Sequence, residues 1–310
     1  MRVSIVGAGA LGSVYAVRLA CLGGCDVEVV GRAAGPRRRI RIEHPDDGEV
    51  LEWTSPPVVD RASVTAAVAV VCVRYEDLEG LVPRLSGTSA VPVVMTPMMP
   101  SDRDRLARAL GRPLLAGMPS ALAYETSAGG IRYWLPRVAT TWIERRSPPG
   151  PEQELTVRLN RAGVSARQDG DVLARNAATT VSFVPLAMAL DVGGSVDAVL
   201  ADSALLSLAI DAAAEGRELG RNLGKAEAWA STVLRFAGPL ALRLGVGVAR
   251  SRSPEIITYV EKHFGRKLHA QNVVMAERIV ALAAERGTRR KALTKLLDRL
   301  RGETGERPLR

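Results

Sequence analysis

The chain has 310 residues, of which 47% are apolar, and this length and composition favour two domains with separate hydrophobic cores. The net charge of +9 is mostly dispersed, and the basic clusters contain no interleaved aromatic residues, which argues against a nucleic-acid-binding protein. The three cysteines predict neither a structural disulfide nor a metal site. We also expect a cytoplasmic protein without a membrane segment, because the sequence shows no leader pattern and no apolar run of about 20 residues.

Strands and helices alternate through the first half of the chain. Short β-branched runs predict strands at 2–7, 27–30, 68–73 and 91–95. Helical spacing predicts helices at 8–22, 77–85 and 153–162, and a further strand is expected at 139–143. The run at 68–73 lacks polar alternation, which is typical of a parallel strand buried on both faces. The alternation predicts an α/β domain over residues 1–168, built on a Rossmann-type, doubly wound parallel sheet.

Only long helical periods follow from residue 169 onward. They predict an all-α second domain over residues 169–310, with helices at 172–190, 196–219, 225–244, 254–264, 268–286 and 290–300. A cleft between the two domains is the expected place for a substrate.

The segment Gly7-Ala-Gly9-Ala-Leu-Gly12 matches the dinucleotide fingerprint G-x-G-x-x-G. It follows a predicted strand and opens a predicted helix, which is the context that this motif requires. Gly7 permits a tight turn, Gly9 lets the backbone approach a pyrophosphate, and Gly12 lets the helix pack closely on the strand. The amides at the start of the helix, at Ala10 and Leu11, are expected to bind the phosphates.

The second predicted strand ends at Gly31-Arg32, about 20 residues past this motif, where an NAD-binding chain usually carries an acid for the ribose. An acid would repel a 2′-phosphate, whereas an arginine can bind it through two hydrogen bonds. We therefore predict NADP as the cofactor. The neighbouring cluster Arg37–Arg39 can add to the positive field, although a solvated charge run is the expected role.

These features together resemble the ketopantoate reductase family over nearly the whole chain. The resemblance rests on the glycine motif, on Arg32, on the buried strand that ends at Val73-Arg74, on an Asn176-bearing helix, and on His269-Ala-Gln-Asn272 at the start of a penultimate helix. It implies a 6-phosphogluconate-dehydrogenase-like fold, reduction of a 2-oxo acid by NADPH, and a homodimer. It also implies that Val73 and Arg74 bind the cofactor, and that Arg74, in the place of a family lysine, can hold a substrate carboxylate.

The chain departs from the family in its expected chemistry. The family's catalytic lysine aligns with Val172, and no lysine occurs before Lys225. The family's Asn-Gly after the fifth strand is replaced by the segment 95–100, in which Pro97 has neither an amide donor nor a carboxamide. We therefore expect little or no conversion of ketopantoate.

Two groups of polar residues remain as substrate and proton-transfer candidates. Asn176 and Thr180 are four residues apart and share a helix face, where they can bind a substrate or only satisfy the start of a buried helix. His269 falls near the place of a family glutamate and is the best available general acid, although a lone helix histidine is more often a surface or core residue. We predict that Arg74, Asn176 and His269 converge on the nicotinamide.

The predicted function is an NADPH-dependent oxidoreductase that transfers hydride to a C=O or C=N group of a small carboxylate-bearing substrate. Arg74 would hold the anion, and His269 or an ordered water would supply the proton. A protonated imine tolerates the loss of the lysine, because a cation beside it would disfavour its binding. A biosynthetic imine or opine-type reductase is therefore one alternative. The other is a non-catalytic NADP-binding protein that has lost the catalytic lysine.

Overall fold

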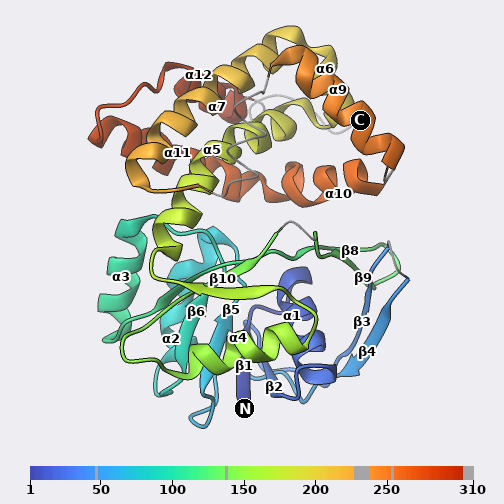
Figure 1. Cartoon of the computed structure of the whole chain (residues 1–310), viewed down its shortest axis with the longest axis vertical. Helices are drawn as coiled ribbons and strands as arrows, with labels where there is room; N and C mark the ends of the chain where they lie inside the picture. Colours follow the sequence, from blue (N-terminus) through green and yellow to red (C-terminus); the bar gives the residue numbers. More distant parts are fainter. Residues whose placement is uncertain (46–47, 137–138, 227–237, 253–254, 303–310) are drawn as a thin grey trace. The chain divides into compact units, whose positions relative to one another are not determined.

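The computed structural model describes residues 1–45, 48–136, 139–226, 238–252 and 255–302 (Figure 1). The chain divides into two compact units, Met1–Leu173 and Ala174–Arg310. The predicted boundary after residue 168 would separate Asp169 from its strand β11 (Ala166–Asp169). The division lies slightly later, in the first turn of helix α5 (Val172–Gly193).

The first unit is built on a seven-stranded sheet with the order β11-β10-β7-β6-β5-β1-β2. Parallel pairing joins five of these strands: β1 (Arg2–Val6), β2 (Asp26–Val30), β5 (Val68–Val71), β6 (Val91–Val94) and β7 (Leu115–Met118). β10 (Thr141–Glu144) then pairs antiparallel with β7, and β11 runs parallel to β10. The predicted Rossmann-type fold class is confirmed, with one antiparallel pairing in place of a fully parallel sheet.

Helices and one 3-10 segment connect these strands. They are α1 (Ala10–Cys21), η1 (Tyr75–Gly80), α2 (Leu81–Leu85), α3 (Pro100–Leu110) and α4 (Pro151–Arg161). β5 is buried at every position, as its unbroken apolar run predicts. The single helix predicted at 77–85 is instead the 3-10 segment η1 followed by the short helix α2.

A second sheet, with the order β4-β3-β9-β8, is missing from the sequence prediction. Its strands are β3 (Arg39–Glu43), β4 (Val50–Thr54), β8 (Leu122–Glu125) and β9 (Ile131–Trp134). Helix α1 contacts strands of both sheets. In β3, Ile40 and Ile42 are buried while Arg39 and Arg41 are exposed, and Arg39 binds Glu52 of the neighbouring strand. Arg39 is therefore a strand residue with an acidic partner and not part of a free charge run.

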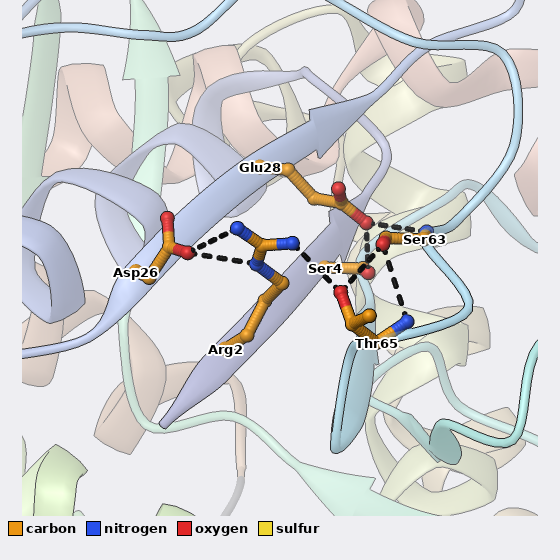
Figure 2. A network of polar contacts seen from close by, with 6 residues as sticks. All are labelled: Arg2, Ser4, Asp26, Glu28, Ser63 and Thr65. Carbon is orange, nitrogen blue, oxygen red and sulfur yellow. Dashed lines mark hydrogen bonds and ion pairs between the residues drawn. The ribbon is translucent and has the colours of Figure 1, made fainter.

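A polar network holds β1, β2 and the segment before β5 together (Figure 2). Arg2 Nε donates to Asp26 Oδ2 over 2.7 Å, and Arg2 Nη1 donates to Thr65 Oγ1 over 2.7 Å. Glu28 accepts hydrogen bonds from Ser4 Oγ and from the Ser63 amide. Because Arg2 and Asp26 begin their strands, the network starts at the N-terminal ends of the strands, whereas the glycine turn follows the C-terminal end of β1. The network has a structural role, and it engages both acids of β2, Asp26 and Glu28, in holding the sheet.

Every element of the second unit is helical in the part of the chain that the structure describes. After α5 come α6 (Val196–Ala201), α7 (Ser203–Leu223), α9 (Pro239–Arg252), α10 (Glu255–Phe264), η2 (Arg266–Leu268), α11 (His269–Glu285) and α12 (Lys291–Gly302). The helix predicted at 196–219 is two helices, because Asp202 caps α7 by accepting from the Leu205 amide over 2.9 Å. Of the helix predicted at 225–244, residues 227–237 lie outside the described part.

Helices α5 and α7 pack unusually closely through glycines of α7. A Cβ at Gly216 would lie 2.2 Å from the Val181 carbonyl oxygen, and a Cβ at Gly220 would lie 2.9 Å from that of Ala178. α5 is long and apolar enough to cross a membrane, but 61% of its most apolar window is buried within the protein. This burial is the pattern of a core helix.

Candidate dinucleotide site

Two glycines of the fingerprint are required by the geometry of the turn between β1 and α1. Gly7 has a φ of +105°, and a Cβ there would lie 2.5 Å from the Cys72 carbonyl oxygen. A Cβ at Gly12 would lie 1.9 Å from the Gly7 carbonyl oxygen, so α1 rests directly on the turn. Gly9 differs, because a Cβ there would meet no protein atom within 4 Å. Its missing side chain leaves open a space that the protein itself does not fill.

The start of α1 lies beside this space, and no side chain caps its first backbone amides. Gly9 is the N-cap residue, so no side chain accepts from the first amides of the helix, and the first turn contains no acidic residue. The first amides of a helix have no partner within the helix and lie at its positive end. Such a terminus suits an anionic phosphate group.

A pocket of about 250 Å³ opens at this turn. Its lining consists of Gly7, Ala8, Gly9, Gly31, Arg32, Cys72, Val73, Arg74, Asp77 and Arg84. Five residues predicted for the cofactor therefore lie around one space: Gly7, Gly9, Arg32, Val73 and Arg74. The other three, Ala10, Leu11 and Gly12, form the first turn of α1 and do not line the pocket.

The pocket carries three arginines and one carboxylate. Arg32 Nη2 donates to Asp77 Oδ2 over 2.9 Å and to Asp77 Oδ1 over 3.2 Å. Arg74 Nη1 lies 3.7 Å from Glu76 Oε1, and Arg84 adds a third guanidinium to the lining. The surplus of positive charge suits an anionic ligand.

The pocket lining includes two charged residues, Asp77 and Arg84, that the sequence analysis does not predict. Both belong to the segment after β5, which the sequence predicts only as a helix, so their approach to Arg32 depends on the folding of the whole sheet. One signal does exist in the sequence. In an open α/β sheet the ends of neighbouring strands meet at one edge, and β5 lies beside β1 in the same parallel sheet as β2. The polar residues that follow β5 are therefore candidates for the same site.

Hydrogen bonds from neighbouring elements hold the pocket wall after β5. Thr96 Oγ1 donates to the Val73 carbonyl oxygen over 2.5 Å. Tyr75 Oη donates over 2.7 Å to Asp102 Oδ2, which belongs to α3. Burial raises the pKa of the Cys72 thiol to about 12, so this residue adds no negative charge to the wall at neutral pH. The wall is therefore fixed, and its charges come from the arginines and Asp77.

Asn176 and Thr180 lie together in the second unit, as their spacing predicts. Thr180 Oγ1 donates to Asn176 Oδ1 over 3.2 Å, and Asn176 is only 4% exposed. The neighbouring hydroxyls of Thr179 and Ser182 each donate to the carbonyl oxygen four residues earlier in α5. The Asn176–Thr180 pair remains the candidate for a substrate contact on this helix.

His269 begins α11 and is bound to a buried carboxylate that sequence reasoning misses. Its Nδ1 lies 3.1 Å from Asp191 Oδ2, which also accepts from Asn272 Nδ2 over 2.9 Å. Because Asp191 is the acceptor in both contacts, Nδ1 of His269 is the donor, and only Nε2 is available to exchange a proton with a ligand. Asp191 is 3% exposed, which gives this cluster a clear role in joining α11 to the end of α5.

The structure does not bring His269 and Asn176 to one reacting centre. Asp191 follows Asn176 by 15 positions on α5, which at 1.5 Å per residue separates them by roughly 22 Å along the helix axis. His269 is in direct contact with Asp191. The prediction that Asn176 and His269 converge on one nicotinamide is therefore wrong, because the length of α5 separates them.

Comparisons with known proteins agree with the fold and the turn. Residues 3–90 match the family model of ketopantoate reductase PanE/ApbA, which confirms the predicted resemblance. No curated protein matches the chain. The dimeric ketopantoate reductase from Staphylococcus aureus is similar in structure, with 11% identity, a TM-score of 0.66, and 97% of this chain and 98% of the other covered.

Two further solved structures show the same likeness. A PanE/ApbA family ketopantoate reductase from Ralstonia eutropha JMP134 has 17% identity and a TM-score of 0.67, with 97% of each chain covered. A ternary structure of D-mandelate dehydrogenase with NADH and anilino(oxo)acetate has 13% identity and a TM-score of 0.67, with 98% of each chain covered. At these identities the likeness establishes a shared fold.

Proposed function

We propose that this protein is an NADPH-preferring oxidoreductase that reduces a C=O or C=N group of a small carboxylate-bearing substrate other than ketopantoate. The observation that carries the proposal is the pocket at the glycine turn, which is lined by Arg32 and by Gly9, the N-cap residue of α1. The similar reductases and the NADH-bound dehydrogenase support a nicotinamide cofactor at this turn.

The residues of the pocket fit a dinucleotide. The open space beside Gly9 gives a pyrophosphate access to the first amides of α1. Arg32 offers a planar fork to a 2′-phosphate, whereas β2 is followed by no acid at this point. Such a cofactor, when bound, supplies the hydride. The chain then has to bind the substrate, orient it and provide for its proton.

The proposed contacts to the substrate are Arg74 for its carboxylate and the Asn176–Thr180 pair for the group that is reduced. The Arg74 side chain is 46% exposed and its Nη1 lies 3.7 Å from Glu76 Oε1, so a substrate carboxylate would compete with Glu76 for this cation. Asn176 lies within one turn of the boundary at Leu173. An oxo acid substrate is supported by the anilino(oxo)acetate bound to the similar D-mandelate dehydrogenase.

The proposed proton source is water and not a side chain at the family's lysine position. Val172 stands there and is 0% exposed, so it provides no acid. His269 is bound to Asp191 at the other end of α5. A protonated imine needs no enzyme acid when it accepts hydride, and this favours an imine or opine-type reductase as the second candidate. The same substitution also fits a non-catalytic NADP-binding protein.

We further propose that the protein acts as a homodimer in the cytoplasm. A dimer is supported by the dimeric ketopantoate reductase from Staphylococcus aureus. A reducing compartment is supported by the odd cysteine count of the sequence, which contains Cys21, Cys25 and Cys72.

The test of the proposed function is oxidation of NADPH in the presence of a panel of 2-oxo acids and imines, followed as loss of the absorbance of the reduced cofactor. The proposal expects turnover with at least one member of the panel and almost none with ketopantoate. Asn176→Ala should lower that turnover, while Ser182→Ala, a change on the same helix, should leave it unaltered. Stoichiometric binding of NADPH without any turnover would favour the non-catalytic alternative.

A further inference from the structure

Asp77 is the one carboxylate among the residues that line the dinucleotide pocket in the described part of the chain. It comes from η1, after β5, and not from the end of β2, where NAD-binding chains usually place their acid. Both of its carboxylate oxygens accept from the same Arg32 nitrogen, over 2.9 and 3.2 Å. The pocket therefore does contain an acid at its arginine end, supplied by the 3-10 segment η1.

The two partners of this ion pair differ in how firmly they are held. The Asp77 side chain is 30% exposed, and its amide donates to the Arg74 carbonyl oxygen over 3.1 Å. The Arg32 side chain is 75% exposed. Arg32 can therefore turn toward a ligand at little cost, while Asp77 stays in the wall beside it.

We propose that Asp77 is a specificity-determining residue that limits the preference of this pocket for NADPH over NADH. This inference rests on the proposed use of a nicotinamide cofactor. The Asp77 carboxylate competes with a 2′-phosphate for the Arg32 guanidinium and repels the phosphate as a like charge. Toward NADH the same carboxylate can accept a hydrogen bond from a ribose hydroxyl, which is the role of the usual acid at the end of β2.

The proposal predicts that the two cofactors respond differently to loss of the carboxylate. Asp77→Asn keeps the size of the side chain, frees Arg32 from its ion pair and removes one negative charge. NADPH binding should become about 5- to 10-fold tighter, a range expected for removing one like charge from a partly exposed site. NADH binding should stay the same or weaken, so the ratio of the two dissociation constants should rise by at least about 5-fold.

Glu79→Gln is the matched control. Glu79 belongs to the same 3-10 segment and the substitution changes the net charge equally, but its side chain is 74% exposed, is paired with Arg105 and is absent from the pocket lining. Binding of NADPH and NADH to the full chain and both variants can be measured by titration calorimetry. Adenosine 2′,5′-bisphosphate and AMP serve as probes of the ribose end alone, and the bisphosphate should follow NADPH.

Three results would overturn the inference, and they can be told apart. Weaker NADPH binding by Asp77→Asn would mean that Asp77 orients Arg32 for the phosphate. Equal shifts for NADPH and NADH, or the same shifts with Glu79→Gln, would mean that only net charge matters; in both cases the proposed function would stand. Failure of the unmodified protein to bind either cofactor would remove the proposed function together with the inference.

Discussion

Substitution of Gly9 and Gly12 by alanine separates the cofactor role of the glycine turn from its structural role. Gly9 has ordinary backbone angles for any residue, with φ −76° and ψ −174°, and a Cβ there meets no protein atom within 4 Å. Gly9→Ala should therefore cost less than about 1 kcal/mol of folding free energy, the loss expected for alanine at a helix N-cap. Its methyl group, however, enters the space proposed for the pyrophosphate. NADPH binding should weaken by at least ~10-fold, which corresponds to about 1.4 kcal/mol.

Gly12→Ala, in contrast, should clearly lower the folding stability. The added Cβ would stand 1.9 Å from the Gly7 carbonyl oxygen, so α1 has to move away from the turn. Overpacking of this kind costs about 1–3 kcal/mol, which for a protein of this size lowers the melting temperature by about 2–5 °C.

Thermal unfolding and equilibrium titration with NADPH, carried out on both variants, test this reasoning. A Gly9→Ala protein that binds NADPH as the unmodified protein does would show that no ligand approaches Gly9. A Gly12→Ala protein with an unchanged melting temperature would refute the packing of α1 on the turn.

Three further predictions concern Arg32, Asp191 and Cys72. Arg32→Asp should weaken NADPH binding by about 10-fold or more and narrow the preference over NADH, because it replaces a phosphate-binding cation with an anion; equal binding of NADH and NADPH by the unmodified protein would refute the role of Arg32. Asp191→Asn should destabilise the protein by about 1–2 kcal/mol in urea unfolding, since a buried carboxylate accepts from both His269 and Asn272, whereas the exposed Asp211→Asn should have no effect. Burial raises the pKa of Cys72 to about 12, so its thiol stays protonated and should alkylate much more slowly than the exposed Cys21 near neutral pH; mass spectrometry showing equal rates would contradict this.

The parts of the fold that follow from local pattern could be predicted from the sequence. The unbroken apolar run of β5 and the glycine turn before α1 both depend on residues close together in the chain. The alternation Arg39-Ile-Arg-Ile42 is equally local and indicates a half-buried strand. It is missed because Arg37–Arg39 is interpreted only as a cluster of charge. The pairing of β3 with β9 could not be predicted, because it joins segments about 90 residues apart whose register is set by the packed sheet.

The candidate site could be predicted only where its residues belong to one motif or one helix. Gly7 and Gly9 belong to a motif with a known role, and Asn176 and Thr180 are neighbours by helical spacing alone. Asp77 reaches Arg32 from the 3-10 segment after β5, so only the order of strands in the sheet reveals the pair. The position of His269 is missed for a related reason. Its partner Asp191 lies at the far end of α5. The sequence predicts which residues share a face of this helix, but it does not predict which other helices pack against that face.

A crystal structure of the protein with NADP bound would test the central claim most directly. The pyrophosphate should lie on the first amides of α1 beside Gly9, and the 2′-phosphate should lie within about 3 Å of the Arg32 guanidinium. A dinucleotide bound elsewhere, or one whose 2′-phosphate points away from Arg32 into solvent, would contradict the account.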